Sequence, residues 1–210
     1  MNKVKVYIAC LILSAITMGC TKNSETTVVF LGEESYVEEI TNVIPDSLLN
    51  LFETYFGTIH SGYIPPNVEG EYLITPKQRV FSNIPESQWP LDIVEPNVKI
   101  TLSKQHNREC IIQLDEATST LTDTVYITGR DNFFTIYYTE EKILQHSGYE
   151  HCVIRDIIIK GEMTEYGIDN LNIASIIANV KDNSNGDIFQ YKRGDFFIYK
   201  DGDRFSEKLN

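Results

Sequence analysis

From residue 70 onward, apolar and polar residues alternate along the chain in short runs, which is the pattern of half-buried β-strands. In the run 132–141, NFFTIYYTEE, alternation places Phe134, Ile136 and Tyr138 on one face. Comparable runs, separated by turn signals such as DEATST and GRDN, occupy residues 71–76, 78–83, 98–104, 109–117, 121–129, 151–163, 172–180, 187–194 and 195–203. The pattern predicts about eight to nine strands joined as an antiparallel meander.

One helix is predicted ahead of the strands, over residues 46–57. Asp46 is a good N-cap, and Gly57 is a good residue to follow the helix end. The segment between them carries a broad apolar stripe that includes Leu51, so we expect this stripe to pack on the sheet. A weaker helical pattern covers residues 141–148.

Strands at even spacing with almost no helix among them predict an all-β domain. A sheet of this kind either closes as a barrel or folds into a sandwich. The domain is expected to occupy residues 44–210, and no sequence repeat divides it.

The N-terminal segment has the features of an export signal. Lys3 and Lys5 precede an almost purely apolar run, Val6–Met18. As a helix this run extends about 20 Å, which is shorter than the hydrocarbon core of about 30 Å. A basic start followed by a short apolar run is typical of a secretory signal, which we assign to residues 1–19.

Cys20 follows a small residue, Gly19, and precedes the polar run 21–25. This arrangement resembles a bacterial lipobox, so Cys20 is predicted to carry acyl chains such as palmitate, with residues 20–43 forming the lipidated cysteine and its tether. The alternative is an ordinary secretory signal in which Cys20 is incidental.

The net charge of the chain restricts the kinds of partner that it can bind. The chain has 18 Lys and Arg against 30 Asp and Glu, a net charge of −12, and loss of residues 1–19 would remove two of the lysines. Such a surface repels phosphate backbones, so nucleic acid is not an expected partner. Anionic lipid headgroups are disfavoured for the same reason, and contact with a membrane is expected through the lipid anchor.

Two cysteines remain within the predicted domain, Cys110 and Cys152, each near the start of an apolar run. In an oxidising compartment they could form a disulfide. Two buried free thiols are an equally good interpretation.

Catalytic motifs are not found. The sequence has no G-x-S-x-G, H-E-x-x-H, G-x-G-x-x-G, P-loop or C-x-x-C motif. We therefore predict a protein that is not an enzyme, with no cofactor and no metal site.

The segments 59–74, IHSGYIPPNVEGEYLI, and 199–206, YKDGDRFS, carry a family resemblance. A helix, a turn and then glycine and an aromatic residue at the first strand resemble the start of lipocalin-like (calycin-type) barrels. More closely, the two segments resemble lipocalin-like lipoproteins of Bacteroidales bacteria, over residues 44–206. The resemblance implies a lipocalin-like barrel, lipid-anchored in the bacterial cell envelope, in the outer membrane.

Two functions follow from a barrel of this size, because its interior is either filled by side chains or holds one small ligand. In the first, the barrel binds a small apolar or amphipathic ligand, and the cavity lining is expected to include Tyr72, Phe134, Ile136 and Tyr138. In the second, a filled barrel serves as a structural module or contacts another envelope protein.

Overall fold

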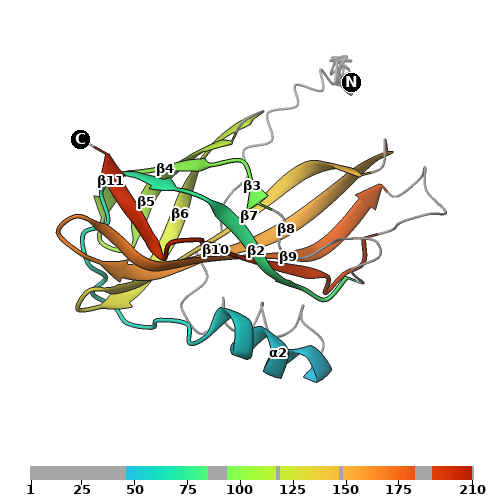
Figure 1. The fold of residues 1–210 in the computed structure, drawn as a ribbon, viewed down its shortest axis with the longest axis horizontal. Coiled ribbons are helices and arrows are strands. Elements are labelled where there is room, and N and C mark those ends of the chain that lie inside the picture. Colours follow the sequence, from blue (N-terminus) through green and yellow to red (C-terminus); the bar gives the residue numbers. More distant parts are fainter. Residues whose placement is uncertain (1–45, 85–93, 117–118, 147–148, 183–190, 210) are drawn as a thin grey trace, which may run out of the picture.

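The computed structural model describes residues 46–84, 94–116, 119–146, 149–182 and 191–209 (Figure 1). Its elements are α2 (Asp46–Phe56), β1 (Gly70–Ile74), β2 (Lys77–Ser82), β3 (Val94–Glu95), β4 (Val98–His106), β5 (Glu109–Glu116), β6 (Ser119–Arg130), β7 (Phe133–His146), β8 (Tyr149–Met163), β9 (Gly167–Asp182), β10 (Phe196–Asp201) and β11 (Phe205–Leu209). The predicted signal, Cys20 and the tether lie outside these ranges. Within them, no helix combines the length and apolarity needed to span a membrane.

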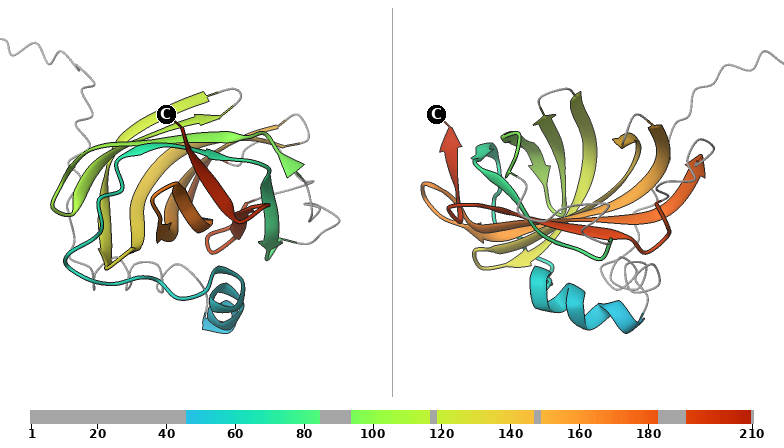
Figure 2. Two further views of the ribbon diagram at one scale, coloured as in Figure 1. Left: turned by 60° about the vertical axis from the view of Figure 1, so that its left-hand side comes forward. Right: turned by 45° about the vertical axis from the view of Figure 1, so that its right-hand side comes forward.

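Eight strands close into an antiparallel barrel, which confirms the predicted fold class. Strands β4 to β9 follow one another as a meander, β1 pairs with β4, and β11 pairs with both β1 and β9. The curved sheet and its closure are visible in Figure 2. The one helix of the described residues, α2, lies against the outside of this sheet (Figure 1).

A corner beside the barrel departs from a simple meander. Pro76 separates β1 from β2 and Gly202 separates β10 from β11, and the Gly202 amide donates to the Pro76 carbonyl oxygen at 2.8 Å. Beyond this corner β10 pairs with β9 and β2, and β2 pairs with β3. The long strand β9 pairs with both β11 and β10 along the same edge, because β11 pairs with its beginning and β10 with its middle.

Two predictions about individual elements need correction, and one strand was missed. The helical pattern at 141–148 is wrong, because β7 continues to His146 and pairs with β8 through Tyr149. The predicted strand 187–194 is not seen in its described part, residues 191–194, which lead into a turn; the rest lies outside the described residues. Strand β11 was not predicted, because its five residues alternate too briefly to give a signal.

Half of the barrel is filled by apolar side chains. Tyr72 of β1 points inward as predicted, Ile74 lies on the same face of the strand, and both are fully buried. They belong to one continuous apolar cluster. The part of this cluster called here the filled half consists of Tyr72, Ile74, Ile100, Leu102, Cys110, Ile112, Val125, Ile127, Phe134, Ile136 and Ile168.

The helix packs on the outer face of the sheet through a narrow stripe. Phe52 and Phe56 are buried there, and the Phe52 ring lies 5.6 Å from that of Phe196 on β10. The expectation that Leu51 is buried is wrong, since its side chain is 40% exposed. Phe52 and Phe56 are four residues apart and share one side of the helix, whereas Leu51 is rotated by about 100° from Phe52. A charge placed at Leu51 would therefore remain in water.

Candidate ligand-binding cavity

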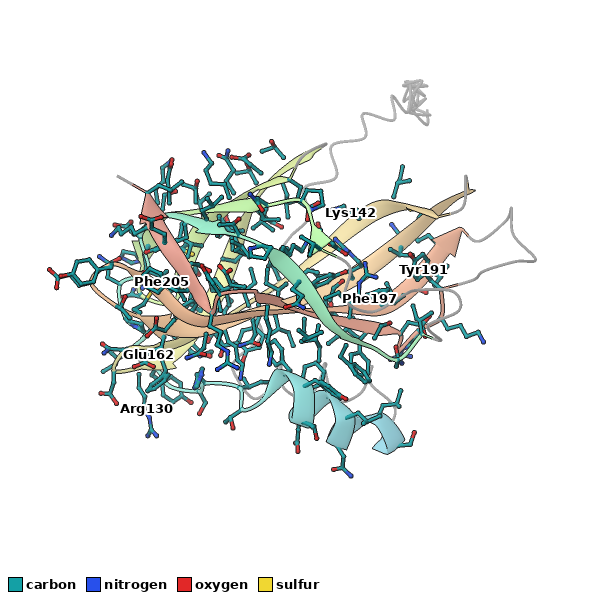
Figure 3. The ribbon with its side chains drawn as sticks, viewed as in Figure 1. Arg130, Lys142, Glu162, Tyr191, Phe197 and Phe205 are labelled. Atoms are coloured by element: carbon teal, nitrogen blue, oxygen red, sulfur yellow. The ribbon has the colours of Figure 1, made fainter. Side chains whose placement is uncertain are left out.

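A cavity of about 260 Å³ lies in the barrel beyond the filled half. Strand β7 shows how the sequence forms it, because its inward positions change from Phe134 and Ile136 to Tyr138, Glu140 and Lys142 along the strand. The apolar positions pack in the core, and the last three line the cavity. Figure 3 shows Lys142, Tyr191 and Phe197 in one half of the barrel and Phe205 in the other.

Paired residues across four strands form the cavity wall. The register places Tyr138 beside Ile157, Ile157 beside Ser175, and Ser175 beside Phe197. The next row toward the core consists of Ile136, Ile159, Ile173 and Tyr199. The wall is therefore mostly aliphatic and aromatic, and Ser175 is a hydroxyl set among apolar neighbours.

Charged side chains surround the other end of the cavity. Lys77 of β2 lies 3.2 Å from Glu95 and 3.4 Å from Glu116, measured from its Nζ to the carboxylate oxygens. Lys142 Nζ donates to Glu116 at 2.7 Å, and Arg79 forms an ion pair with Glu95. These ion pairs join β2, β3, β5 and β7. We call Lys77, Glu95, Glu116, Glu140, Lys142 and Arg155, which all line the cavity, the charged layer.

Arg155 of β8 and Glu140 of β7 form the most buried pair of the charged layer. Their side chains are 13% and 8% exposed, and the Arg155 guanidinium donates to Glu140 Oε1. The pair is in register across the two strands, so the backbone holds both side chains at the same height. Charged groups this buried are costly unless each has a partner. Their presence beside a cavity is typical of a functional site.

Three tyrosines add hydroxyl groups to the lining. Burial raises the pKa of Tyr138, Tyr191 and Tyr199 above the ordinary value. Their phenols therefore stay protonated at neutral pH and can donate hydrogen bonds. The cavity combines an apolar wall with hydroxyls and ion pairs, which suits an amphipathic molecule.

Glu116 should make the free energy of unfolding decrease as the pH falls into the acid range. Burial acts to raise its pKa, but Lys77 and Lys142 outweigh burial and lower the pKa from 4.5 to about 2. Because the folded-state pKa is depressed, the stabilisation is present above about pH 4.5 and is lost as pH falls toward 2. With solvent screening we expect a loss of about 1–2 kcal/mol from this group.

Urea unfolding of wild type and Glu116→Gln at pH 6 and again near pH 2.5 measures the effect, and the variant should lose less stability between the two conditions by about that amount. An equal loss in both proteins would contradict this role of Glu116.

Of the four residues expected to line a cavity, one does so and three do not. Tyr138 lines the cavity, whereas Tyr72, Phe134 and Ile136 are packed within the filled half and do not line it. All four side chains are buried, but only Tyr138 lies at the level of the cavity along its strand.

Several lining residues were not identified from the sequence, above all Ser175, Arg155 and the glutamates. Two of the strands, β5 and β7, carry a sequence feature that could have revealed the glutamates. Glu116 continues the inward face of Ile112 and Leu114, and Glu140 continues that of Tyr138. A charge at an inward position of a strand predicts either a strand end or a polar interior.

No disulfide joins Cys110 and Cys152 in the structure, so the pairing considered from the sequence is not formed. They lie on β5 and β8, which two other strands separate in the sheet. Cys110 is buried in the filled half, and burial together with Glu69 raises the pKa of its thiol to about 12. Cys152 Sγ lies 3.3 Å from Glu141 Oε1 and donates to it.

Comparison with known proteins gave no match to any family model, to any curated protein or to any solved structure. Over the described ranges, no three His, Cys, Asp or Glu side chains are grouped to hold a metal ion. The barrel and the chemistry of its cavity are therefore the features that indicate a function.

Proposed function

We propose that this protein is a lipid-anchored, non-enzymatic protein of the bacterial cell envelope whose lipocalin-like barrel binds one small amphipathic ligand. The observation that carries the proposal is the cavity of about 260 Å³, with an apolar wall on one side and the charged layer on the other. Ligand pockets usually measure about 300–1,000 Å³, so this volume fits a compact molecule.

The anchoring part of the proposal is supported by Cys20, which follows a short apolar segment and precedes a polar tether. The net charge of −12 gives the protein no electrostatic attraction to anionic lipid, so the acyl chains would hold it at the membrane. The outer membrane is the proposed location.

The alternative, a barrel that serves only as a structural or interaction module, is supported by the filled half. A barrel filled along its whole length would favour that function. Here Ile157, Ser175 and Phe197 border open space rather than a packed interior, so we prefer binding.

Filling the cavity should abolish binding. Leu121 lines the cavity and is partly buried, so the larger ring in Leu121→Trp should occupy the space that a ligand needs. Binding of the neutral dye N-phenyl-1-naphthylamine is measured by its fluorescence, with Ile143→Trp as the matched control because Ile143 is 59% exposed and does not line the cavity.

We expect wild type and Ile143→Trp to bind the dye with equal affinity and Leu121→Trp to bind at least about tenfold more weakly. Equal binding by all three proteins, or no binding by wild type, would contradict the proposal.

Lipid attachment has its own prediction. Growth with labelled palmitate should label the wild-type protein, and Cys20→Ala should remove the label and release the protein from the membrane fraction, because the thiol is the attachment atom. Cys152→Ala is the control, since its thiol lies within the barrel domain, and it should leave labelling unchanged. Labelling that persists in Cys20→Ala would rule out this anchor.

A further inference from the structure

Ser175 contributes a buried hydroxyl group to the cavity wall. Its side chain is 2% exposed, and its Oγ has no partner among the described residues. On either side in the sheet lie Ile157 and Phe197, so its neighbours in that row are apolar. Burial of an unpaired hydroxyl is unfavourable, and such a group in a cavity wall indicates contact with a polar atom from outside the chain.

A second donor lies one row away. Arg155 is two residues from Ile157, the neighbour of Ser175 on β8, and it also lines the cavity. Its terminal guanidinium nitrogen is engaged by Glu140, while its Nε is buried without a hydrogen bond in the described part of the chain. The Nε–H can only donate, and the serine hydroxyl can donate as well. Both groups therefore suit an acceptor oxygen.

The charges around the cavity argue against an ionic ligand. Each cation of the charged layer already has a carboxylate partner: Lys77 has Glu95 and Glu116, Lys142 has Glu116, and Arg155 has Glu140. A charged headgroup would have to break one of these pairs and leave a buried charge uncompensated, which is strongly unfavourable. An uncharged headgroup leaves every pair intact.

We propose that the cavity selects an uncharged amphipathic molecule that carries a carbonyl oxygen, as in a ketone or an ester. The oxygen accepts a hydrogen bond from Ser175 Oγ, with Arg155 Nε as the second donor, and the hydrocarbon part lies on Ile157, Ile173 and Phe197. This inference rests on the proposed function and adds the ligand class and the residue that determines it.

The test is displacement of N-phenyl-1-naphthylamine by four probes with matched alkyl chains. They are 2-octanone, its hydrocarbon isostere 2-methyl-1-octene, octanoate and octylammonium. In wild type we expect 2-octanone to bind about fivefold to tenfold more tightly than 2-methyl-1-octene, which is the effect of one hydrogen bond to a neutral group. The two ions should bind more weakly than 2-octanone.

In Ser175→Ala the preference for 2-octanone over 2-methyl-1-octene should fall to about twofold or less, while the affinity for the hydrocarbon stays the same. Ser206→Ala is the matched control. Ser206 is fully buried like Ser175, but its hydroxyl donates to Asp201 Oδ2 at 2.7 Å and it does not line the cavity. Ser206→Ala should lower the melting temperature and keep the ketone preference. Ser175→Ala should lose the ketone preference without a lower melting temperature, because its hydroxyl forms no hydrogen bond with the described residues.

A wild-type protein that binds octanoate or octylammonium more tightly than 2-octanone would overturn the inference. So would an unchanged ketone preference in Ser175→Ala. Both results leave the binding function standing, whereas a wild-type protein that binds neither the dye nor any probe would overturn the proposed function itself.

Discussion

Tyr72→Ala is expected to lower the free energy of unfolding by about 3–5 kcal/mol, the usual cost of truncating a large buried aromatic residue. Tyr72 is fully buried in the filled half, and burial raises its pKa to about 12. Its ring fills the space between β1 and the inward residues of β4, and its hydroxyl donates to the Val68 carbonyl oxygen at 3.0 Å. Removal of the ring leaves a void in this packed cluster. Urea unfolding measures the loss.

Tyr72→Phe separates the ring from the hydroxyl. It keeps the packing and removes the hydroxyl, which donates to the Val68 carbonyl oxygen at 3.0 Å and also lies 3.3 Å from that of Glu69, so the expected loss is about 1 kcal/mol. Because Tyr72 does not line the cavity, folded Tyr72→Ala should bind N-phenyl-1-naphthylamine like wild type. A small loss of stability combined with weaker dye binding would instead place Tyr72 in the binding site and contradict the division of the barrel into two halves.

Arg155→Met should destabilise the fold by about 3–5 kcal/mol, because it leaves the Glu140 carboxylate as an uncompensated buried charge. Glu140 is 8% exposed, and Arg155 is the partner in register with it on the next strand. Methionine keeps much of the aliphatic volume of arginine, so the loss reports on charge rather than on packing. Thermal and urea unfolding both measure it.

The double variant Arg155→Met/Glu140→Leu removes both charges and is the control. It should recover most of the stability, since an apolar pair of similar volume often replaces a buried ion pair at little cost. A double variant that is as unstable as Arg155→Met would show that the charged layer stabilises the barrel through more than this pair. A single variant of wild-type stability would show that Glu140 gains no stability from Arg155.

Strand alternation predicted much of the barrel because each strand has one face in the core. The inward face Phe134, Ile136 and Tyr138 and the start of β1 at Gly70 both agree with the structure. The helix was also predictable, since Asp46 and Gly57 mark its two ends and Gly57 adopts a positive φ of 80°. These features depend on local sequence, which is why they could be read from it.

The position and the charged lining of the cavity could not be predicted, because they depend on contacts between distant segments. Lys77 of β2 meets Glu95 because β2 pairs with β3, and this pairing lies beyond the corner at Pro76. Glu116, which also contacts Lys77, comes from β5. Alternation shows which residues face inward but not how far along the barrel the side chains fill it. Tyr72 and Tyr138 therefore looked equivalent in the sequence and are not equivalent in the fold.

Binding of an uncharged carbonyl compound in the cavity is tested most directly by a crystal structure of the protein soaked with 8-bromo-2-octanone, whose bromine gives an anomalous signal. We expect a bromine peak in the space bounded by Ile157, Ile173 and Phe197, with the ketone oxygen within hydrogen-bond distance of Ser175 Oγ. A bromine peak only on the outer surface, or a cavity that stays free of the probe at saturating concentration, would contradict it.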